Sequence, residues 1–296
     1  MSSKFLLSLL TQDQDFQAHE ATEAARVAAR RGVDVEVVYA RNNPLLQAEQ
    51  LYRAVHATIA ARPLAVVVHP VADEGIARVA REAIAAGIGW VQLARDASYI
   101  DDLRANAANV PVSVVRTDQQ LVGRIQAQQL RERLPSGGSV LYLQGPATTS
   151  ASEHRRVGLE IGLQGSQISL EVLCGEWTEK SGEEAVRSWL RLSKSENREI
   201  QAVCAQNDSM AIGARKAMEA RRPEWLRVPF IGCDGLRGGG QRLVNTRELS
   251  ATVIIESNAG RAIDLLADYY CNNSRSLPRR LVLEPKAYPL VAVPAA

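Results

Sequence analysis

The sequence predicts an α/β protein built from two doubly wound parallel sheets. Short apolar runs alternate with longer segments of helical periodicity along the chain, which is typical of parallel βαβ units. There are ten such apolar runs, more than one sheet of this size usually contains. The length of 296 residues also suits two hydrophobic cores, each of roughly 150 residues, better than a single core.

Each apolar run is interpreted as a strand because it is short, rich in Val, Ile and Leu, and bounded by turn residues. In chain order the predicted strands are 4–10, 33–40, 64–70, 88–94, 110–115, 139–145, 168–175, 202–207, 228–234 and 249–255. The segments between them are amphipathic or alanine-rich, which favours helices. The clearest predicted helices are 17–31, 43–61, 74–86, 119–134, 182–192 and 259–270.

The boundary between the two domains is expected near Arg116, where a strand ends and Asp118 is suited to cap the next helix. The segment after the helix at 259–270 is too short for a third domain, so it must return to the existing two. We therefore expect one domain from 1–116 and about 256–283. The other domain is expected from 117–255 and about 284–296, with several parallel hinge strands crossing between the two.

The charge of the chain excludes some classes of partner. It has 35 basic and 33 acidic residues, which leaves a net charge of +2. A charge this close to neutral provides no basic field that would attract nucleic acid or an anionic membrane. No run approaches the roughly 20 apolar residues that a membrane-spanning helix needs. Neither nucleic acid binding nor membrane insertion is therefore expected.

The four cysteines, Cys174, Cys204, Cys233 and Cys271, are far apart in the sequence. They form no CxxC motif and no Cys/His cluster with metal-ligand spacing. We therefore expect buried free thiols, no metal site and no cofactor. Free thiols are compatible with a reducing compartment.

The N-terminal segment up to Phe16 is interpreted as a first strand rather than a signal peptide. Its apolar run is shorter than the hydrophobic region of a signal peptide, and no small-residue cleavage site follows it. The chain as written is therefore expected in the cytoplasm. If a secretory segment had been removed, the compartment would be the periplasm.

Polar and aromatic residues that follow the predicted strands are the candidates for a ligand-binding site. Open parallel sheets bind ligands beyond the carboxyl ends of their strands, where loops and helix N-termini converge. In chain order the candidates are Asp13, Phe16, His69, Arg95, Asp96, Glu153, Arg155, Trp177, Asn207, Asp234 and Glu256.

Two of these candidates have well-defined structural alternatives. Asn207, and equally Asp208 beside it, can cap the helix that follows, since either side chain can accept from the free amides of the first turn. Two consecutive polar residues at one cap leave one of them available for another role. Asp234 can initiate an Asx turn with Gly235.

The aromatic candidates and the histidine are also ambiguous. An isolated aromatic residue is usually part of a core, and this applies to Phe16 and Trp177. Both, however, stand among polar residues at loop positions, which is equally compatible with stacking on a ligand. His69 precedes Pro70, where a turn residue is more common than a ligand-binding residue.

Four segments together resemble the type I periplasmic binding protein superfamily. They are "VSVVRTDQQLVGRIQAQQL", "AQNDSMAIGARKAM", "FIGCDGL" and "LSATVIIESNAGRAIDLL". This superfamily includes ribose- and galactose-binding proteins and the effector domains of LacI-type repressors. The match covers nearly the whole chain in order, so it is more specific than a single motif. It implies two similar α/β domains joined by three crossing hinge strands, with a sugar in the cleft.

The resemblance implies roles for individual residues. Asn207 matches the asparagine that hydrogen-bonds ligand hydroxyls, and Asp234 matches the aspartate that accepts from them. Arg95 matches an arginine that follows the fourth strand. Phe16 matches a first-loop aromatic residue, and Trp177 resembles the tryptophan that stacks on the sugar ring in galactose-binding proteins.

Departures from the family pattern leave the ligand open. Ala94 stands where the family usually has an aspartate, with Asp96 on the other side of the arginine. Residues 254–256, Ile-Ile-Glu, stand where many relatives have Gln or Asn. After the sixth strand, the family arginine aligns with either Glu153 or Arg155.

The resulting hypothesis is non-catalytic binding of a small ligand, a sugar or polyol, in an interdomain cleft that closes by a hinge. Such a protein would work in ABC-type uptake with a permease, or in ligand sensing with a signalling protein. One alternative is the effector-binding core of a LacI-like regulator without the helix-turn-helix that normally precedes it. A sugar-processing enzyme is a further alternative, but the sequence has no GxSxG, P-loop or HExxH motif, so catalysis is not expected.

Overall fold

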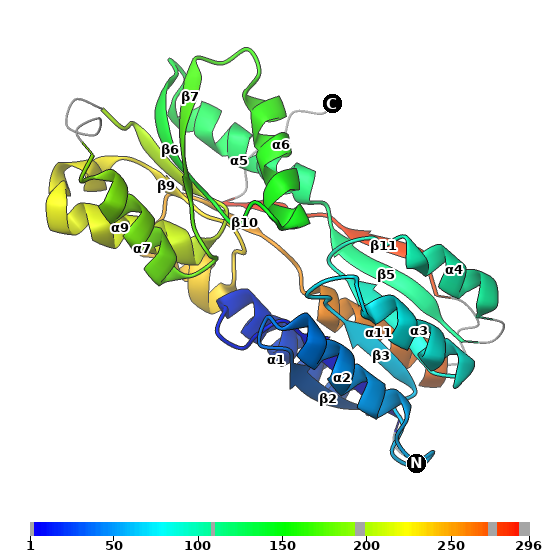
Figure 1. Ribbon diagram of the computed structural model, residues 1–296. Helices are drawn as coiled ribbons and strands as arrows, with labels where there is room; N and C mark the ends of the chain where they lie inside the picture. The colour runs from blue at the N-terminus through cyan, green and yellow to red at the C-terminus, as the bar shows by residue number, and fades with distance from the viewer. Residues whose placement is uncertain (1–2, 108–109, 193–198, 272–276, 290–296) are drawn as a thin grey trace. The chain divides into compact units, whose positions relative to one another are not determined.

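The computed structural model describes residues 3–107, 110–192, 199–271 and 277–289 (Figure 1). The chain divides into two compact units, Met1–Thr117 with Ser257–Leu283 and Asp118–Glu256 with Glu284–Ala296. The chain therefore passes between the units three times, after Thr117, Glu256 and Leu283. The second domain was expected to extend to residue 296, and its last residues lie outside the described part of the chain.

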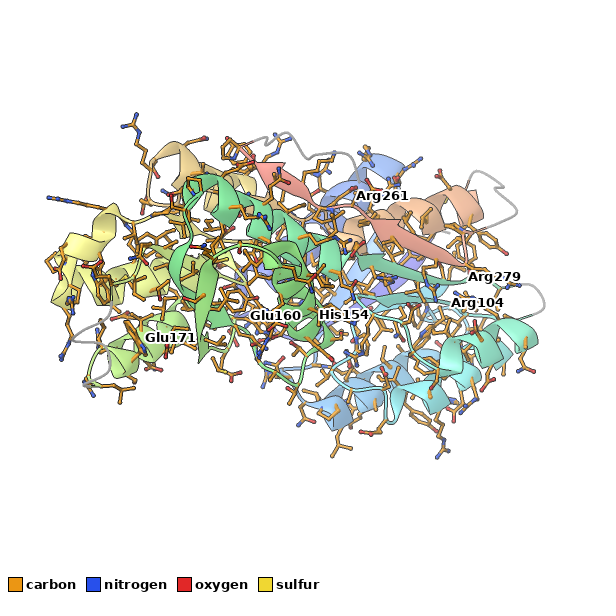
Figure 2. The ribbon with its side chains drawn as sticks, turned by 90° about the horizontal axis from the view of Figure 1, so that it is seen from above. Arg104, His154, Glu160, Glu171, Arg261 and Arg279 are labelled. Carbon is orange, nitrogen blue, oxygen red and sulfur yellow. The ribbon has the colours of Figure 1, made fainter. Side chains whose placement is uncertain are left out.

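Unit 1 is built on a six-stranded sheet with the strand order β11-β5-β4-β3-β1-β2. All of its neighbouring strands are parallel. The strands are β1 (Lys4–Leu9), β2 (Asp34–Tyr39), β3 (Ala65–Val68), β4 (Gly89–Leu93), β5 (Val112–Thr117) and β11 (Arg280–Leu283). Strand β11 is added from the C-terminal segment, and the Arg104 guanidinium on α4 donates to the carbonyl of Arg279 beside it (Figure 2).

Helices cover both faces of this sheet. They are α1 (Asp15–Arg31), α2 (Pro44–Val55), α3 (Ile76–Ala85), α4 (Tyr99–Asn106) and α11 (Asn258–Cys271). Successive side chains of a strand point to opposite faces. Leu7 of β1 therefore packs in a core with α1 and α11, while its neighbour Leu6 packs in a core with α2, α3 and α4.

Unit 2 is built on a four-stranded parallel sheet with the order β7-β6-β8-β9. Its strands are β6 (Gly138–Gln144), β7 (Ile168–Cys174), β8 (Ala202–Ala205) and β9 (Phe230–Ile231). One face packs against α5 (Gln119–Arg133) and α6 (Ser150–Leu163), and the other against α7 (Glu179–Trp189) and α9 (Asp208–Arg221). This arrangement makes unit 2, like unit 1, a doubly wound α/β structure, as the sequence predicted.

The remaining elements of unit 2 complete its C-terminal part. Strands β10 (Thr252–Ile254) and β12 (Lys286–Tyr288) form an antiparallel pair. Several parallel hinge strands were expected from the sequence, and this expectation is wrong for β10 and β12, which run antiparallel. Between β9 and β10 lie three short helical segments, η1 (Pro223–Arg227), η2 (Arg237–Gln241) and α10 (Arg242–Asn245).

The predicted elements agree well with those observed. Each of the ten apolar runs contains a strand, and each of the six predicted helices contains a helix. Asp118 caps α5 as expected, since its Oδ1 accepts from the N–H of Leu121 at 2.9 Å. The main difference in length is α2, which ends at Val55 instead of continuing to Ala61.

Helices α5 and α6 approach each other closely because glycines face each other at their contact. A Cβ atom at Gly158 of α6 would lie 2.0 Å from the carbonyl oxygen of Gln120 on α5. A Cβ atom at Gly123 of α5 would lie 2.0 Å from the carbonyl oxygen of Arg155 on α6. The lack of side chains at these positions therefore sets how near Arg155 lies to α5.

The prediction of buried thiols is correct for two of the four cysteines. Cys204 and Cys233 are buried and free. Cys174, at the end of the edge strand β7, and Cys271, the last residue of α11, are free but exposed. An apolar run ends at each of these two positions, so the side chain reaches solvent.

Two general features concern the described residues as a whole. None of the helices in residues 3–107, 110–192, 199–271 and 277–289 has the length and apolar character needed to cross a membrane. Over the same ranges, no three His, Cys, Asp or Glu side chains come together as a group that could bind a metal ion.

Candidate ligand-binding site

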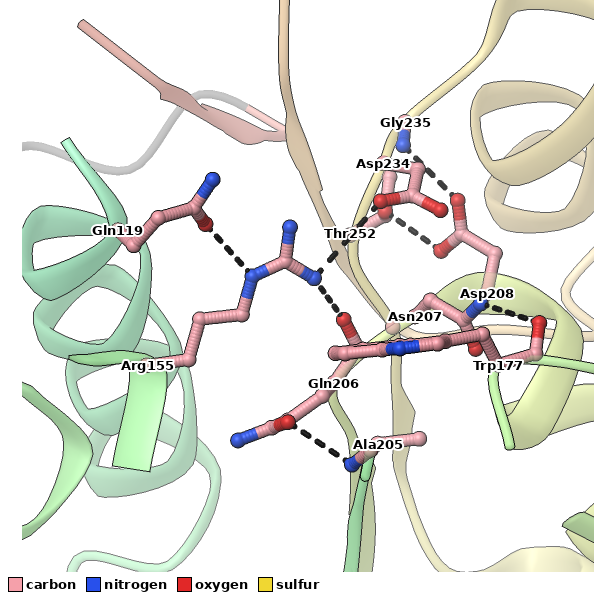
Figure 3. Close-up of polar contacts among 12 residues, drawn as sticks. Gln119, Arg155, Trp177, Ala205, Gln206, Asn207, Asp208, Asp234, Gly235 and Thr252 are labelled. Carbon is pink, nitrogen blue, oxygen red and sulfur yellow. Dashed lines mark hydrogen bonds and ion pairs between the residues drawn. The ribbon is translucent and has the colours of Figure 1, made fainter. Parts of the chain in front are cut away.

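Four candidate residues of unit 2 come together beyond the carboxyl ends of its parallel strands (Figure 3). Arg155 follows β6, Trp177 follows β7, Asn207 follows β8 and Asp234 follows β9. We call this group the unit 2 face. Because all four strands run in the same direction, residues far apart in the sequence meet at one edge of the sheet.

Arg155 is the central cation of the unit 2 face. It lies in the second turn of α6 and is buried. Its Nε donates to Gln119 Oε1 at 2.7 Å, and its Nη1 donates to the carbonyl of Gln206. The same Nη1 lies 3.8 Å from Asp234 Oδ1, and the guanidinium carbon lies 5.5 Å from the centre of the Trp177 ring.

The structure distinguishes Arg155 from Glu153, between which the sequence could not choose. Glu153 is exposed in the first turn of α6, as is His154 beside it (Figure 2). Residues two positions apart on a helix point in directions about 200° apart. The packing of α6 on α5 therefore directs Arg155 towards the other members of the unit 2 face.

Asp234 is buried and has a backbone φ of 99°, which is rare for a residue with a side chain. Its N–H donates to the carbonyl of Val253 at 3.0 Å, and its carbonyl accepts from Ile255 at 3.1 Å. The N–H of Gly235 donates to Asp208 at 2.9 Å. Bonds to the segment around β10 and to Asp208 therefore hold this turn.

Asp208 is a buried carboxyl group behind this turn. Its Oδ1 accepts from Thr252 Oγ1 at 2.6 Å and its Oδ2 from Gly235 N. Burial, and secondarily the charge of Asp234, raise the pKa of Asp208 well above its ordinary value, although the bonds from Thr252 and Gly235 act in the opposite direction. The group therefore retains a proton at pH values where an exposed aspartate has lost it.

Replacement of Asp208 with Asn is expected to reduce the pH dependence of stability. The folded-state pKa lies above the unfolded value of 3.8, so this group contributes most stability below that value and loses it as the pH rises towards the folded pKa. In urea titrations, the free energy of unfolding of Asp208→Asn should therefore fall less than that of the parent between about pH 4 and about pH 8.

Asp264→Asn provides a control with the opposite sign. The Arg31 guanidinium on α1 lowers the pKa of Asp264, so this carboxylate stabilises the fold above its unfolded pKa and loses that effect in acid. Its replacement should remove stability mainly at neutral pH. Equal pH dependence in the parent and in Asp208→Asn would contradict the raised pKa of Asp208.

Asn207 acts as a cap, one of the two roles considered from the sequence. Its Oδ1 accepts from the N–H of Met210 at 2.9 Å, and its Nδ2 donates to the carbonyl of Trp177 at 2.8 Å. The same side chain therefore caps α9 and holds the loop that carries Trp177. Contact with a ligand stays a prediction for this residue.

Trp177 is half-buried and has a φ of 65°. Its ring lies against Gly145, where a Cβ atom would come within 2.3 Å of the ring. The Arg155 guanidinium lies over the ring at 5.5 Å. Trp177 also packs against the core that α7 and α9 form on the sheet. Stacking on a ligand stays a prediction for this residue.

Gln206 is a supporting residue that was not among the candidates. It is buried, its Oε1 accepts from Gly145 N at 2.9 Å, and its Nε2 donates to Tyr142 Oη at 2.7 Å and Ser152 O at 2.8 Å. It thereby ties the end of β8 to the loop before α6. The sequence feature that could have identified Gln206 is its position, as a polar residue directly after an apolar strand.

The candidates of unit 1 lie beyond the carboxyl ends of its own sheet. We call this group, which consists of Asp13, Phe16, His69, Arg95 and Asp96, the unit 1 face. Asp13 is exposed, with its Oδ2 accepting from Thr11 Oγ1 at 3.0 Å. Phe16 is half-buried at the second position of α1, with its ring 6.3 Å from that of His19. The backbone near Asp13 therefore forms a local turn that leads into α1.

Arg95 and Asp96 follow β4 but have different partners. Arg95 pairs with Asp73 at 3.0 Å and donates to the carbonyl of Pro70 at 3.2 Å. Asp96 pairs with Arg280 at 2.8 Å and with Arg116 at 3.3 Å. Asp96 thus joins β5 and β11 at the edge of the sheet, which is a structural role for a residue predicted to bind ligand.

His69 is half-buried immediately after β3. Its Nδ1 lies 3.1 Å from Gln17 Nε2. Burial, and secondarily the charge of Arg95, lower the pKa of His69 to about 3, so the ring is neutral at physiological pH.

Glu256 is the last residue of its segment of unit 2, two positions after β10. Its side chain is exposed, whereas Ile255 before it is buried. The backbone of Ile255 is bonded to that of Asp234. The role of Glu256 in binding stays a prediction.

The fold is that of a type I periplasmic binding protein. The chain belongs to this family, because the family model described as "Periplasmic binding protein domain" matches residues 5–269.

The chain is similar to named binding proteins. It is 26% identical over 231 residues to the ribose import binding protein RbsB of Escherichia coli (strain K12), covering 78% of this chain and 71% of that protein. It is 30% identical over 166 residues to the xylitol-binding protein of Mycolicibacterium smegmatis (strain ATCC 700084 / mc(2)155), covering 52% of this chain and 46% of that protein. Both relatives are named as binding proteins and not as enzymes.

A solved structure shares the fold. The periplasmic solute-binding protein of an ABC transporter from Actinobacillus succinogenes 130z, with bound D-allose, superimposes with a TM-score of 0.80. The alignment covers 97% of each chain at 20% identity.

Proposed function

We propose that this protein binds a sugar or polyol without chemical conversion and delivers it to an ABC permease. The observation that carries this proposal is the unit 2 face, where the buried ions Arg155 and Asp234 lie with the half-exposed Trp177 ring at the strand ends. The names of the relatives, which include ribose import and xylitol-binding proteins, support the same class of ligand.

The chemistry of the unit 2 face suits neutral hydroxyl groups. A carboxylate accepts hydrogen bonds from hydroxyls, and a guanidinium donates to their oxygens. Hydrogen bonds to charged groups contribute about 1.5–3 kcal/mol each, and an aromatic ring adds about 0.5–1.5 kcal/mol beyond burial when it stacks. Micromolar affinity corresponds to about 8 kcal/mol, so a few such contacts are sufficient.

The unit 1 face offers a second set of polar groups, of which His69 and Arg95 are the principal members. We propose that these groups also bind hydroxyl groups of the ligand. A periplasmic location fits this role.

A thermal-shift screen tests the proposed function. D-ribose, D-allose, xylitol and myo-inositol cover the furanose, pyranose, acyclic and cyclitol forms. A ligand that binds only the folded state raises its stability by about 2.7 kcal/mol at 100 times Kd. At least one compound should therefore raise Tm and show saturable binding by calorimetry. If the folded protein bound none of them, the assignment to sugars and polyols would be wrong.

Ligand binding is expected to change the emission of Trp177. Its ring is half-exposed, whereas the other three tryptophans, Trp90, Trp189 and Trp225, are buried in hydrophobic cores. Fluorescence titration of the parent with a compound confirmed by calorimetry should show a change that Trp177→Phe lacks. An equal change in both proteins would show that the ring does not contact the ligand.

A further inference from the structure

The side chain of Gln17 on α1 connects the end of β1 to the ring of His69 after β3. Gln17 is buried on the face of α1 that packs on the sheet. Its Oε1 lies 3.2 Å from the N–H of Leu10, and its Nε2 lies 3.1 Å from His69 Nδ1.

The Leu10 contact determines how the Gln17 amide is oriented. The backbone N–H of Leu10 is a donor, so the atom that faces it must be the oxygen of the amide. The amide nitrogen of Gln17 then faces His69. Because this nitrogen can only donate, His69 Nδ1 has to be the acceptor.

An unprotonated Nδ1 determines the state of the whole ring. A neutral imidazole carries one proton, so this proton is on Nε2. An imidazolium would direct an N–H from Nδ1 at the donor of Gln17. Rotation of the Gln17 amide would not relieve this contact without directing a donor at Leu10. Burial and the Arg95 charge favour the neutral ring as well.

The backbone around His69 is held on both sides. Its N–H donates to the carbonyl of Ser8 at 2.9 Å, and its carbonyl accepts from Gln47 Nε2 at 2.9 Å. Gln47 Oε1 accepts from Val71 N at 2.8 Å. The ring therefore has a defined position as well as a defined tautomer.

The charge near the His69 ring also favours its neutral form. Arg95 is the charged residue that affects His69 electrostatically, and it is paired with Asp73 at 3.0 Å. A cation in this position disfavours a second positive charge on the ring.

We propose that Gln17 is a positioning residue that holds His69 as the neutral Nε2–H tautomer, so that the unit 1 face presents a fixed hydrogen-bond donor to the ligand. The part of this inference that concerns a ligand rests on the proposed function. It specifies that the ligand group at His69 is an acceptor, such as a hydroxyl, ether or carbonyl oxygen. An ammonium group cannot take this position, because it has no lone pair.

Histidine ¹⁵N spectra of the parent protein test the tautomer without any ligand. The chain has four histidines, and His69→Asn identifies the signals of His69 by their loss. We expect a protonated Nε2 and an unprotonated Nδ1 that do not change between about pH 5 and about pH 8, although a free histidine titrates in this range. A protonated Nδ1 at neutral pH overturns the proposal.

Gln17→Glu tests whether Gln17 causes this state. One carboxylate oxygen still accepts from Leu10, but the other faces Nδ1 and favours a proton there. In this variant His69 should carry a proton on Nδ1, and its pKa should rise. Gln14→Glu is the matched control. It adds the same charge at the N-cap of α1, where the Gln14 side chain makes no capping hydrogen bond. An unchanged His69 spectrum in Gln17→Glu overturns the role of Gln17.

Binding measurements separate this inference from the proposed function. With D-ribose, D-allose, xylitol or myo-inositol as the probe, the parent and Gln14→Glu should show the same affinity at about pH 5.5 and about pH 8. Gln17→Glu should bind more weakly at the higher pH, where Nε2 has lost its proton. A pH-independent Gln17→Glu overturns the ligand contact of His69. Failure of all four probes, with the Nε2–H tautomer observed, overturns the proposed function and leaves the positioning role supported.

Discussion

Replacement of Asp234 with Asn is expected to weaken ligand binding at least tenfold. Asp234 supplies the buried carboxylate of the unit 2 face, and a hydrogen bond to a charged group contributes about 1.5–3 kcal/mol. A tenfold change in affinity corresponds to about 1.4 kcal/mol. Calorimetry with the sugar or polyol that binds the parent, together with Tm of the ligand-free variant, measures both effects on one sample.

Asn is the appropriate substitution because of the conformation of this residue. Asn tolerates positive φ better than Ala, so the backbone at 99° is less disturbed. Some loss of stability is still expected, since Arg155 loses the carboxylate 3.8 Å away. Asp118→Asn removes the same charge from the cap of α5, where Asn caps equally well, and it should bind as the parent does. A destabilised Asp234→Asn with normal affinity would make Asp234 a structural residue only.

Replacement of Gly158 with Val is expected to destabilise unit 2 by about 3 kcal/mol or more. The new Cβ atom would lie 2.0 Å from the Gln120 carbonyl oxygen, and a backbone atom cannot move aside by a rotamer change. For a domain of this size, about 3 kcal/mol corresponds to a decrease in Tm of about 6–12 °C. Helix α6 would have to move away from α5, and Arg155 would move with it.

Gly238→Val is the matched control for this prediction. A Cβ atom at Gly238 has no other atom within 4 Å, so the same side chain is accommodated there. Thermal unfolding of the two variants should therefore differ by most of the effect at Gly158. Equal values of Tm would show that α5 and α6 can separate at little cost.

The local features of the fold could be read from the sequence because their causes are local. Except for the edge strands β2 and β7, which are only partly buried, the apolar runs that became β1 to β10 contain buried residues, and this burial explains their apolar character. The cap formed by Asp118 depends only on a residue three positions away. The length of α2 was overestimated, because its helical pattern continues into residues that form a turn after His56.

The partners of the candidate residues could not be read in the same way. Asn207 was suited both to a cap and to a ligand, and its second partner is the carbonyl of Trp177, thirty positions away. Asp96, for which ligand binding stays a prediction, pairs with Arg116 and with Arg280, which belongs to a strand added from the C-terminal segment. No local pattern indicates such long-range contacts.

Gln17 is an example of a long-range contact that the sequence indicates in part. It lies on the same face of α1 as the buried residues Glu20, Ala24 and Val27, so the helical pattern places a polar side chain where an apolar one is expected. The pattern indicates that Gln17 has a buried partner. It does not indicate that the partner is His69, which belongs to another strand.

The sequence by itself determined the order of the elements, the two doubly wound sheets and the edge of each sheet at which polar residues gather. The order of the elements follows from apolar periodicity, which is visible in each stretch of the chain. The edge where polar residues gather follows from the shared direction of parallel strands. Only the tertiary structure decided that Arg155 and not Glu153 meets Asp234, and that His69 meets Gln17. Those pairings depend on how closely helices pack on their sheets and on each other, and this distance is set by side chains that are remote in sequence, such as the glycines between α5 and α6.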